Sequence, residues 1–284
     1  MLTTKTKVSL ASLAYKFIAT GRAMAGKNNC VTVRRRGLIW SLDLSEGIDF
    51  SIYLLGAFER STAITLEKLV KPGDVVFDLG ANIGAHTLGL ARSVGSAGRV
   101  FAFEPTDFAF DKLKRNLALN PELQARTYPR QVLLAAAPAE DAPDEIFASW
   151  PLEKDDSVHP KHRGRLVTAR NATVDTLDRV VAREGINRVD VIKMDVDGHE
   201  LKVLQGGLTT LSKFRPILVM ELSPYVHAEE HNSFAALVAL LRNAGYSIQH
   251  ASTWAPLPLQ ERELEALIPD GASINVIARA DSRA

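Results

Sequence analysis

The sequence predicts an α/β fold in which a mostly parallel β-sheet carries helices on both faces. Two short apolar runs, residues 75–77 and 100–103, flank a segment with helical periodicity. Continuous apolar runs of this length are typical of parallel strands buried on both faces. Further apolar-rich strands at 189–194 and 216–221 alternate with helical segments, which is the element order of an α/β protein.

A glycine-containing turn, Gly80-Ala81-Asn82-Ile83-Gly84, joins the first of these strands to its helix. Glycine adopts backbone angles closed to other residues and leaves room for a ligand to approach. The helix that follows begins with unpaired N–H groups, which suit a carboxylate or phosphate. Ligands of open α/β sheets bind beyond the carboxyl ends of the strands. The turn therefore predicts a ligand site at this edge of the sheet.

Each of the two strands ends in a carboxylate, Asp78 in the first and Glu104 in the second. Glu104 is placed to accept hydrogen bonds from a ribose diol, and Asp78 suits an ammonium group. The dinucleotide fingerprint G-x-G-x-x-G and the P-loop pattern are both absent. A nucleoside with an amino acid appendage, such as S-adenosylmethionine, fits these features. The alternative is a plain βαβ unit whose carboxylates only cap the strand ends.

Four segments together resemble the FkbM family of S-adenosylmethionine-dependent methyltransferases. They are VVFDLGANIGAHT, VFAFEP, VDTLD and IKMDVDGHELKVLQGG, and the resemblance covers about residues 43–250 in consistent order. It implies the Rossmann-like class I methyltransferase fold, a seven-stranded sheet whose last strand is antiparallel. Asn82 stands where many class I enzymes have a second glycine, and FkbM-like sequences share this asparagine.

The resemblance also implies which residues hold the cofactor. Glu59, with Gly56, matches a glycine and an acid that precede the first motif in FkbM-like chains, and an ordinary helix charge is the equally open alternative for it. The loop after the third strand, expected near residues 131–136, is predicted to flank the adenine. The expected cofactor-binding residues are Glu59, Asp78, Gly80, Ala81, Asn82, Gly84, Thr87, Glu104, Pro105, Ala136 and Asp195.

Three residues are candidates for catalysis. Asp195 ends the fourth strand, so its carboxylate is expected in the same crevice as Asp78 and Glu104. His86 and His199 each lie in the first turn after a strand, and an unperturbed imidazole titrates near ~6.5, which suits a general base. The alternative for each histidine is a polar surface residue. Asp197 and Glu200 are better explained as charges that complement a helix N-terminus.

Composition and charge restrict the class of protein. The 284 residues include 34 basic and 33 acidic ones, a net charge of +1, which disfavours nucleic-acid binding. The single cysteine, Cys30, excludes an intramolecular disulfide and fits a reducing, cytoplasmic location. No apolar run approaches the ~20 residues of a membrane helix. The sequence carries no signal for a particular oligomeric state.

Residues 1–57 are predicted to form an extension with a helix and a β-hairpin, and residues 58–284 the cofactor-binding domain. An amphipathic helix is favoured over a cleaved leader at the start of the chain. Residues 137–171 are expected to be an irregular loop on the substrate side. His159 and His162 within it lack the partners of a metal motif, so no metal is predicted.

The function expected from these features is methylation of a hydroxyl group on a sugar, a glycan or a polyketide-like small molecule, with S-adenosylhomocysteine as product. The alternative from another class is a module that binds the nucleoside without turnover. A nicotinamide oxidoreductase is a third possibility, and Asn82 disfavours it because the dinucleotide fingerprint requires glycine there.

Overall fold

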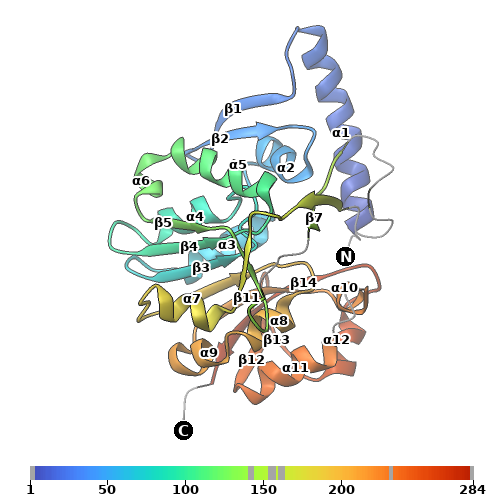
Figure 1. Cartoon of the computed structure of the whole chain (residues 1–284). Coiled ribbons are helices and arrows are strands. Elements are labelled where there is room, and N and C mark those ends of the chain that lie inside the picture. Colours follow the sequence, from blue (N-terminus) through green and yellow to red (C-terminus); the bar gives the residue numbers. More distant parts are fainter. Residues whose placement is uncertain (1–3, 140–143, 153–157, 159–163, 230–232, 282–284) are drawn as a thin grey trace.

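An eight-stranded sheet forms the middle layer of the computed structural model, which describes residues 4–139, 144–152, 158, 164–229 and 233–281 (Figure 1). Its strands follow the spatial order β13-β12-β14-β11-β10-β3-β4-β5. Their bounds are β3 Val75–Leu79, β4 Arg99–Phe103, β5 Thr127–Arg130, β10 Val191–Met194, β11 Ile217–Leu222, β12 Tyr246–His250, β13 Pro256–Leu257 and β14 Ile274–Ala280.

The sheet has the predicted class I arrangement. Strands β5, β4, β3, β10 and β11 are parallel neighbours, and the last strand, β14, runs antiparallel between β11 and β12. The two-residue strand β13 adds an eighth strand at the edge beside β12. Because β3 and β10 occupy the middle of the sheet, the residues that follow them meet at the centre of its carboxyl edge.

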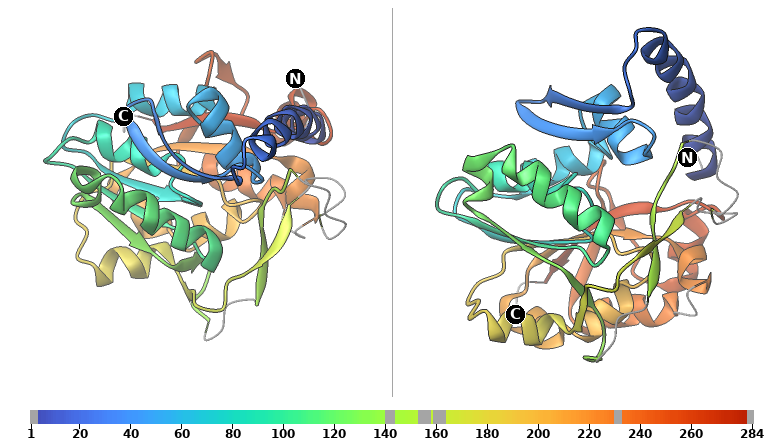
Figure 2. Two further views of the ribbon diagram at one scale, coloured as in Figure 1. Left: turned by 90° about the horizontal axis from the view of Figure 1, so that it is seen from above. Right: turned by 45° about the horizontal axis from the view of Figure 1, so that its top comes forward.

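Helices cover both faces of the sheet, as Figures 1 and 2 show. One face packs against helices late in the chain, and the other against helices early in the chain, so that two hydrophobic clusters form. The first group is α7 Leu177–Arg183, α8 Glu200–Gln205, α9 Leu208–Phe214, α10 Pro224–Glu229, α11 Phe234–Asn243 and α12 Glu261–Leu267. The second is α1 Thr4–Met24, α2 Gly47–Leu55, α3 Arg60–Leu69, α4 Thr87–Ser93, α5 Asp107–Ala118 and α6 Pro121–Gln124.

Side-chain alternation along β3 connects the two clusters. Val75, Phe77 and Leu79 point into the cluster with the late helices, whereas Val76 points into the cluster with the early ones. All five residues of the strand are buried, which is why its sequence lacks polar alternation. Asp78 lies on the same side as Val76, so its carboxylate is buried beneath the early helices.

The first part of the chain forms the predicted helix and hairpin. Helix α1 is followed by β1 Cys30–Arg35 and β2 Leu38–Asp43, which pair antiparallel with Val33 opposite Trp40. The hairpin and α2 bury Trp40 and Phe50 in the same cluster as α4 and α5. A buried ion pair between Asp49 of α2 and Lys112 of α5 joins this extension to the rest of the fold.

Two expectations about the middle of the chain are wrong. The third strand of the main sheet is β5, not residues 131–136. Proline is tolerated in edge strands, so Pro129 does not prevent pairing with β4. Tyr128 stabilises this pairing by stacking on Phe101, with 5.0 Å between the ring centroids. The apolar run after it instead forms β6 Val132–Leu134, which pairs with β9 Thr173–Asp175 in a separate two-stranded sheet.

The described part of residues 137–171 contains an antiparallel pair of strands rather than an irregular loop. These strands are β7 Glu145–Ser149 and β8 Arg165–Thr168. Leu152 N–H donates to the carbonyl of Ser45, and Gly47 N–H donates to that of Trp150, so the segment is attached to the start of α2. His159 and His162 lie outside the described residues.

Candidate active site

A cavity of about 1170 Å³ opens at the carboxyl ends of β3, β4, β10 and β11. Ligand pockets typically have volumes of about 300–1,000 Å³, so this one has room for two ligands side by side. Of the residues predicted from the sequence, the following line it: Glu59, Gly80, Ala81, Asn82, His86, Glu104, Pro105, Asp195 and His199. The cavity therefore coincides with the site predicted from the strand ends.

The glycine-containing turn forms one wall, but its glycines are required mainly by the protein itself. Gly80 has φ 75°, and a Cβ there would lie 1.8 Å from the carbonyl oxygen of Asp195. Gly84 has φ 90°, and its Cβ would lie within 3.0 Å of Leu88 and Leu113. Close packing of the turn on its neighbours therefore requires both glycines, and Gly80 also lines the cavity. That the glycines leave room for a ligand stays a prediction.

Asn82 adopts the left-handed conformation, with φ 48°. Asparagine is several-fold enriched in this region among non-glycine residues, because its short side chain hydrogen-bonds locally. Here its side-chain oxygen accepts from the Ile83 N–H at 2.9 Å. This conformation explains how Asn82 replaces the second glycine without loss of the turn.

Glu104 is held in place by three donors and borders the cavity. One carboxylate oxygen accepts from the Thr106 N–H and hydroxyl, at 2.9 and 2.6 Å, and the other accepts from the Asn82 N–H at 2.9 Å. Burial raises the pKa of Glu104, although these hydrogen bonds oppose the shift. A carboxylate offers about four lone-pair sites, so Glu104 keeps capacity to accept from a ligand hydroxyl.

Asp78 lies behind the cavity wall and pairs with a cation that sequence reasoning missed. Its carboxylate accepts from the Thr87 hydroxyl at 2.6 Å and lies 3.3 Å from Lys193 Nζ. Lys193 also donates to the Gly80 carbonyl at 2.9 Å. A lone lysine within the buried strand 191–194 is the sequence signal that points to such a pair.

Burial alone would lower the pKa of Lys193, but the carboxylates of Asp78 and Asp195 outweigh it and raise that pKa. Lys193 therefore stays charged beside the cavity, which it lines. Asp78 does not line the cavity, whereas its partner Lys193 does. Within the described chain, the predicted residues Asp78, Gly84, Thr87 and Ala136 do not line the cavity.

Asp195 lies on the cavity side of Lys193, with 3.8 Å between its carboxylate and Nζ. Burial raises the pKa of Asp195 to about 6, Lys193 opposes the shift, and the carboxylates of Glu59 and Glu200 add to it. Asp197 lines the same cavity, and its side chain is exposed there. Desolvation within the crevice, and next the charge of the nearby Asp195, raises its pKa well above the ordinary value.

Glu59 and Glu221 complete a group of carboxylates around the cavity. Strand β14 connects them, because Asn275 donates to Glu59 at 3.1 Å and is the register partner of Glu221. Ser273 donates to Glu221 at 2.5 Å. Burial, and next the charge of Asp195, raises the pKa of Glu221 well above its ordinary value.

Sequence reasoning missed Glu221 although it ends a strand, as Asp195 and Glu104 do; the same rule applied to residues 216–221 would have found it. Asn275 and Ser273 have no sequence signal, because they lie far along the chain from Glu59 and become neighbours only through the antiparallel last strand. Glu59 itself has φ 40°, a conformation that costs roughly 1–3 kcal/mol and persists where the surroundings impose it.

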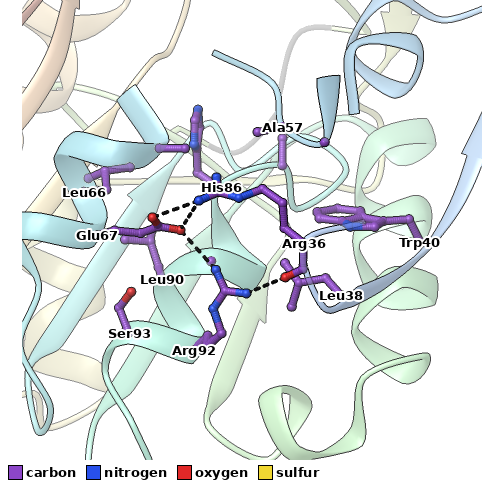
Figure 3. Close-up of a pocket in the computed structure, with 14 residues that line it drawn as sticks. Arg36, Leu38, Trp40, Ala57, Leu66, Glu67, His86, Leu90, Arg92 and Ser93 are labelled. Carbon is purple, nitrogen blue, oxygen red and sulfur yellow. Dashed lines mark hydrogen bonds and ion pairs between the residues drawn. The ribbon is translucent and has the colours of Figure 1, made fainter. Parts of the chain in front are cut away.

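His86 lies between this cavity and a second, small cavity of about 30 Å³ shown in Figure 3. An ion-pair network of Arg36, Glu67 and Arg92 lines the small cavity. Neither ring nitrogen of His86 has a hydrogen-bond partner among the described residues. Burial, assisted by the Lys193 charge, lowers the pKa of His86 to about 3.

This pKa makes His86 a weak base at neutral pH, so Asp195 is the better candidate for accepting a proton. His199 is the residue that precedes α8 and lines the large cavity. Next to it, Glu200 is buried with His227, with 3.2 Å between the carboxylate and Nε2, which supports the loop that carries Asp195 and Asp197.

No group of three or more histidine, cysteine, aspartate or glutamate side chains among the described residues is arranged to hold a metal ion. None of their helices combines the length and apolar character needed to cross a membrane.

Residues 78–248 match the family model for the methyltransferase FkbM domain, which covers more than half of the chain. The chain therefore belongs to the FkbM methyltransferase family. Such a family consists of enzymes that use S-adenosylmethionine as methyl donor, which agrees with the cofactor expected from the sequence.

Curated proteins with similar sequences are also methyltransferases. The chain is 30% identical over 148 residues to the hexuronic acid methyltransferase AglP of Haloferax volcanii. The matched residues make up 51% of this chain and 55% of AglP. It is 30% identical over 158 residues to the methyltransferase sdnD of Sordaria araneosa, 46% of this chain and 59% of sdnD. The chain thus spans less than two thirds of either relative.

A third relative is the 31-O-demethyl-FK506 methyltransferase FkbM of Streptomyces tacrolimicus, 28% identical over 204 residues, with 63% of this chain and 75% of that protein covered. Among solved structures, a methyltransferase FkbM from Methylobacillus flagellatus is similar at a TM-score of 0.44 and 14% identity, over 83% of this chain and 61% of that one.

The residues around the cavity fit S-adenosylmethionine. Glu104 has acceptor capacity for a ribose hydroxyl, and the carboxylates of Glu59, Asp195 and Glu221 suit an ammonium and a sulfonium group. Pro105, Leu133 and Leu134 provide an apolar end to the cavity that suits adenine. Among the described residues that line the cavity, carboxylates outnumber the cations Arg60 and Lys193, which matches the positive charge of this cofactor.

Proposed function

We propose that this chain catalyses methylation of a hydroxyl oxygen on a sugar, a glycan or a polyketide-like small molecule, with S-adenosylmethionine as methyl donor and S-adenosylhomocysteine as product. The observation that carries the proposal is that Glu104 and Asp195 face one cavity of about 1170 Å³. A single cavity of this size accommodates a nucleoside cofactor beside a second molecule.

The bound cofactor supplies a methyl group that is already activated by a positive sulfur. In the reaction a bond forms between the acceptor oxygen and the methyl carbon, the carbon–sulfur bond breaks, and its electron pair remains on sulfur. The chain's own residues align the reactants and exclude water, which contributes on the order of 7–11 kcal/mol in well-oriented reactions. In this proposal Asp195 accepts the proton that the hydroxyl loses.

The pKa of Asp195 supports this role. Raised to about 6, it leaves the carboxylate ionised at neutral pH yet more basic than an ordinary aspartate. His86, with a pKa of about 3, is assigned to contact with the ligand rather than proton transfer. His199 lines the cavity and is a candidate for orienting the acceptor.

The names of two relatives support an oxygen acceptor on a sugar or polyketide-like molecule, since one is a hexuronic acid methyltransferase and another is named for a 31-O-demethyl substrate. The acceptor side of the cavity is lined by Leu10, Ile48 and Leu54 from the first part of the chain and by Ile146 and Leu166 from β7 and β8. The second of these regions belongs to residues 137–171, which were expected on the substrate side, and the near-neutral overall charge supports a small-molecule partner over a nucleic acid.

The test is formation of S-adenosylhomocysteine by the purified chain with a panel of hexuronic acid glycosides, neutral glycosides and polyketide-like alcohols, with product mass measured in parallel. One acceptor that gains a methyl group on oxygen supports the proposal. Tight binding of S-adenosylhomocysteine without turnover of any acceptor supports a binding module instead. Methylation on nitrogen or carbon overturns the assignment of the hydroxyl. Recovery of activity in the cytoplasmic fraction of the source cells would agree with the location expected from Cys30.

A further inference from the structure

Helix α1 carries a row of apolar side chains that no described part of the protein covers. Leu10, Leu13, Phe17 and Met24 are 58%, 70%, 85% and 86% exposed. At 3.6 residues per turn these positions fall on one side of the helix. Figure 1 and both views of Figure 2 show α1 along the edge of the molecule.

The opposite side of α1 is firmly packed, so the exposed row is not a consequence of a loosely placed helix. Tyr15 is buried and makes an edge-to-face contact with Phe50 of α2, with 5.9 Å between ring centroids. Its hydroxyl accepts from the Asn29 side chain at 2.7 Å. Ala11, Ala14 and Ile18 pack on the same cluster.

The exposed row continues towards the cavity. Leu54 and Leu55 at the end of α2 are both more than half exposed, and α1 packs beside α2. Leu10, Leu54 and Leu55 all line the large cavity. The apolar surface formed by Leu10, Leu13, Phe17, Met24, Leu54 and Leu55, called the α1 surface below, therefore reaches the mouth of the candidate active site.

Charge is distributed very unevenly along the chain that carries α1. Residues 1–42 contain eight of the 34 basic residues and none of the 33 acidic ones, so residues 43–284 contain 26 basic and 33 acidic residues. Lys16 on α1 and Lys27 after it are exposed. A helix with an exposed apolar side and exclusively basic charges is typical of segments that lie in the surface of an anionic bilayer.

We propose that the α1 surface docks the protein onto the surface of a membrane that contains anionic lipids. Apolar side chains enter the headgroup region, and the exposed Lys16 and Lys27 face the lipid charges. A second copy of the chain is the less favourable occupant. In a symmetric dimer the same patch faces itself, which sets basic residues against basic residues.

This docking has a consequence for the acceptor, and that consequence rests on the proposed function. Because Leu10, Leu54 and Leu55 border the cavity, its mouth faces the bilayer when α1 lies on it. An acceptor hydroxyl carried by a lipid-linked molecule then reaches Asp195 from the membrane side. Binding to vesicles is measured without cofactor or acceptor, so it succeeds or fails independently of the proposed reaction.

The experiment is flotation of the full chain with vesicles at about 0.1 M salt. One set of vesicles contains phosphatidylcholine alone, and the other contains about 30% phosphatidylglycerol in phosphatidylcholine. We expect the protein to float with the anionic vesicles only. Raising the salt to about 0.5 M should weaken binding, because the Debye length falls well below the ~10 Å of 0.1 M salt.

Phe17→Ser combined with Leu13→Ser should reduce the vesicle partition coefficient at least tenfold, because both side chains lose transfer into the bilayer. Lys16→Gln with Lys27→Gln should reduce it roughly fivefold per charge. Leu208→Ser is the matched control, since Leu208 is a leucine about half exposed on α9, on another side of the molecule. All variants are first compared with the parent by thermal melting, and the exposed sites are not expected to change stability.

Equal flotation of the parent with neutral and anionic vesicles, or none with either, overturns the proposal. So does a loss of flotation in the Leu208→Ser control that matches the loss in the double serine variant. A dimer in sedimentation that dissociates on Phe17→Ser, with no vesicle binding, assigns the α1 surface to a second copy instead.

Discussion

Lys193 and Asp78 face each other across the two central parallel strands. Their Cα atoms are register partners in β10 and β3, and Lys193 Nζ lies 3.3 Å from the Asp78 carboxylate, with both side chains buried. The same ammonium donates to the Gly80 carbonyl and lies 3.8 Å from Asp195. One buried cation therefore fixes the glycine-containing turn and acts on the charge of Asp195, the proposed proton acceptor.

Replacing this cation leaves a buried carboxylate without its partner. We expect Lys193→Met to lower the free energy of unfolding by about 3–5 kcal/mol, measured by urea titration. The double variant Lys193→Met with Asp78→Leu is the control, and it should recover most of the loss because no unpaired charge remains. A single variant within about 1 kcal/mol of the parent would show that the pair does not stabilise the fold.

Glu104 is predicted to act on cofactor binding rather than on folding. Glu104→Gln keeps the shape of the side chain but removes its charge, and we expect S-adenosylhomocysteine binding to weaken by about 1.5–3 kcal/mol in calorimetry. Glu122→Gln, an exposed glutamate on α6, is the matched control and should bind like the parent. Equal affinity of the Glu104 variant and the parent would place the ribose elsewhere.

The strand-end rule accounts for what the sequence predicted well. Glu104 and Asp195 were expected at one edge because parallel strands end together, and both line the cavity. Asp78 was also expected at this edge from its place at the end of a strand, yet it does not line the cavity. Side chains alternate along a strand, and Asp78 falls on the buried side, where it meets Lys193. The strand continues one residue beyond Asp78, to Leu79, so Asp78 points to the face of the sheet instead of into the cavity.

Other features depend on contacts distant in the sequence. The third strand was placed too late because β5 contains Pro129 and an exposed edge, whereas the next segment is a more apolar run. The contact of Asn275 with Glu59 requires the last strand to insert between β11 and β12, and no local pattern encodes that insertion. Likewise, the exposure of Phe17 is visible only once α1 is placed on α2.

Asp195→Asn tests the proposed proton acceptor. Loss of a positioned base lowers turnover about 10²-fold or more, while cofactor affinity changes much less. Asp197→Asn removes a carboxylate from the same cavity and serves as comparison, with a smaller effect expected. Single-turnover rates at saturating cofactor are measured beside melting curves. If Asp195 only supports the turn into α8, stability falls and the surviving protein turns over normally.

The charge state of Asp195 should respond to the cofactor. Its pKa of about 6 means that roughly half the molecules carry a proton there at pH 6. A positive sulfonium nearby favours the ionised form and releases that proton, whereas the uncharged thioether of S-adenosylhomocysteine does so less. We expect calorimetry in buffers of different ionisation enthalpy to show more proton release for S-adenosylmethionine at pH 6 and little difference at pH 8. The same excess in Asp195→Asn would assign the proton to another carboxylate.

The ion pair of Asp49 with Lys112 should make the attachment of the first part of the chain depend on pH. Burial raises the pKa of Asp49 to about 6, even though Lys112 and the Asp43 N–H lower it. The folded protein therefore binds more protons than the unfolded chain between about pH 4 and 6. Stability from this group is greatest at low pH, falls as pH rises through that window, and is constant above it.

Lys112→Met removes the strongest interaction that keeps Asp49 ionised, so the folded pKa rises further and the window extends to higher pH. We expect the variant to be about 3–5 kcal/mol less stable than the parent at pH 8 and clearly less affected at pH 5, where Asp49 takes up a proton. Urea titrations of both proteins at the two pH values measure this difference. Adding Asp49→Asn to the variant is the control, because it should remove the extra pH dependence. A deficit of equal size at both pH values would show that Lys112 acts through the packing of its aliphatic chain between α2 and α5 instead of through its charge.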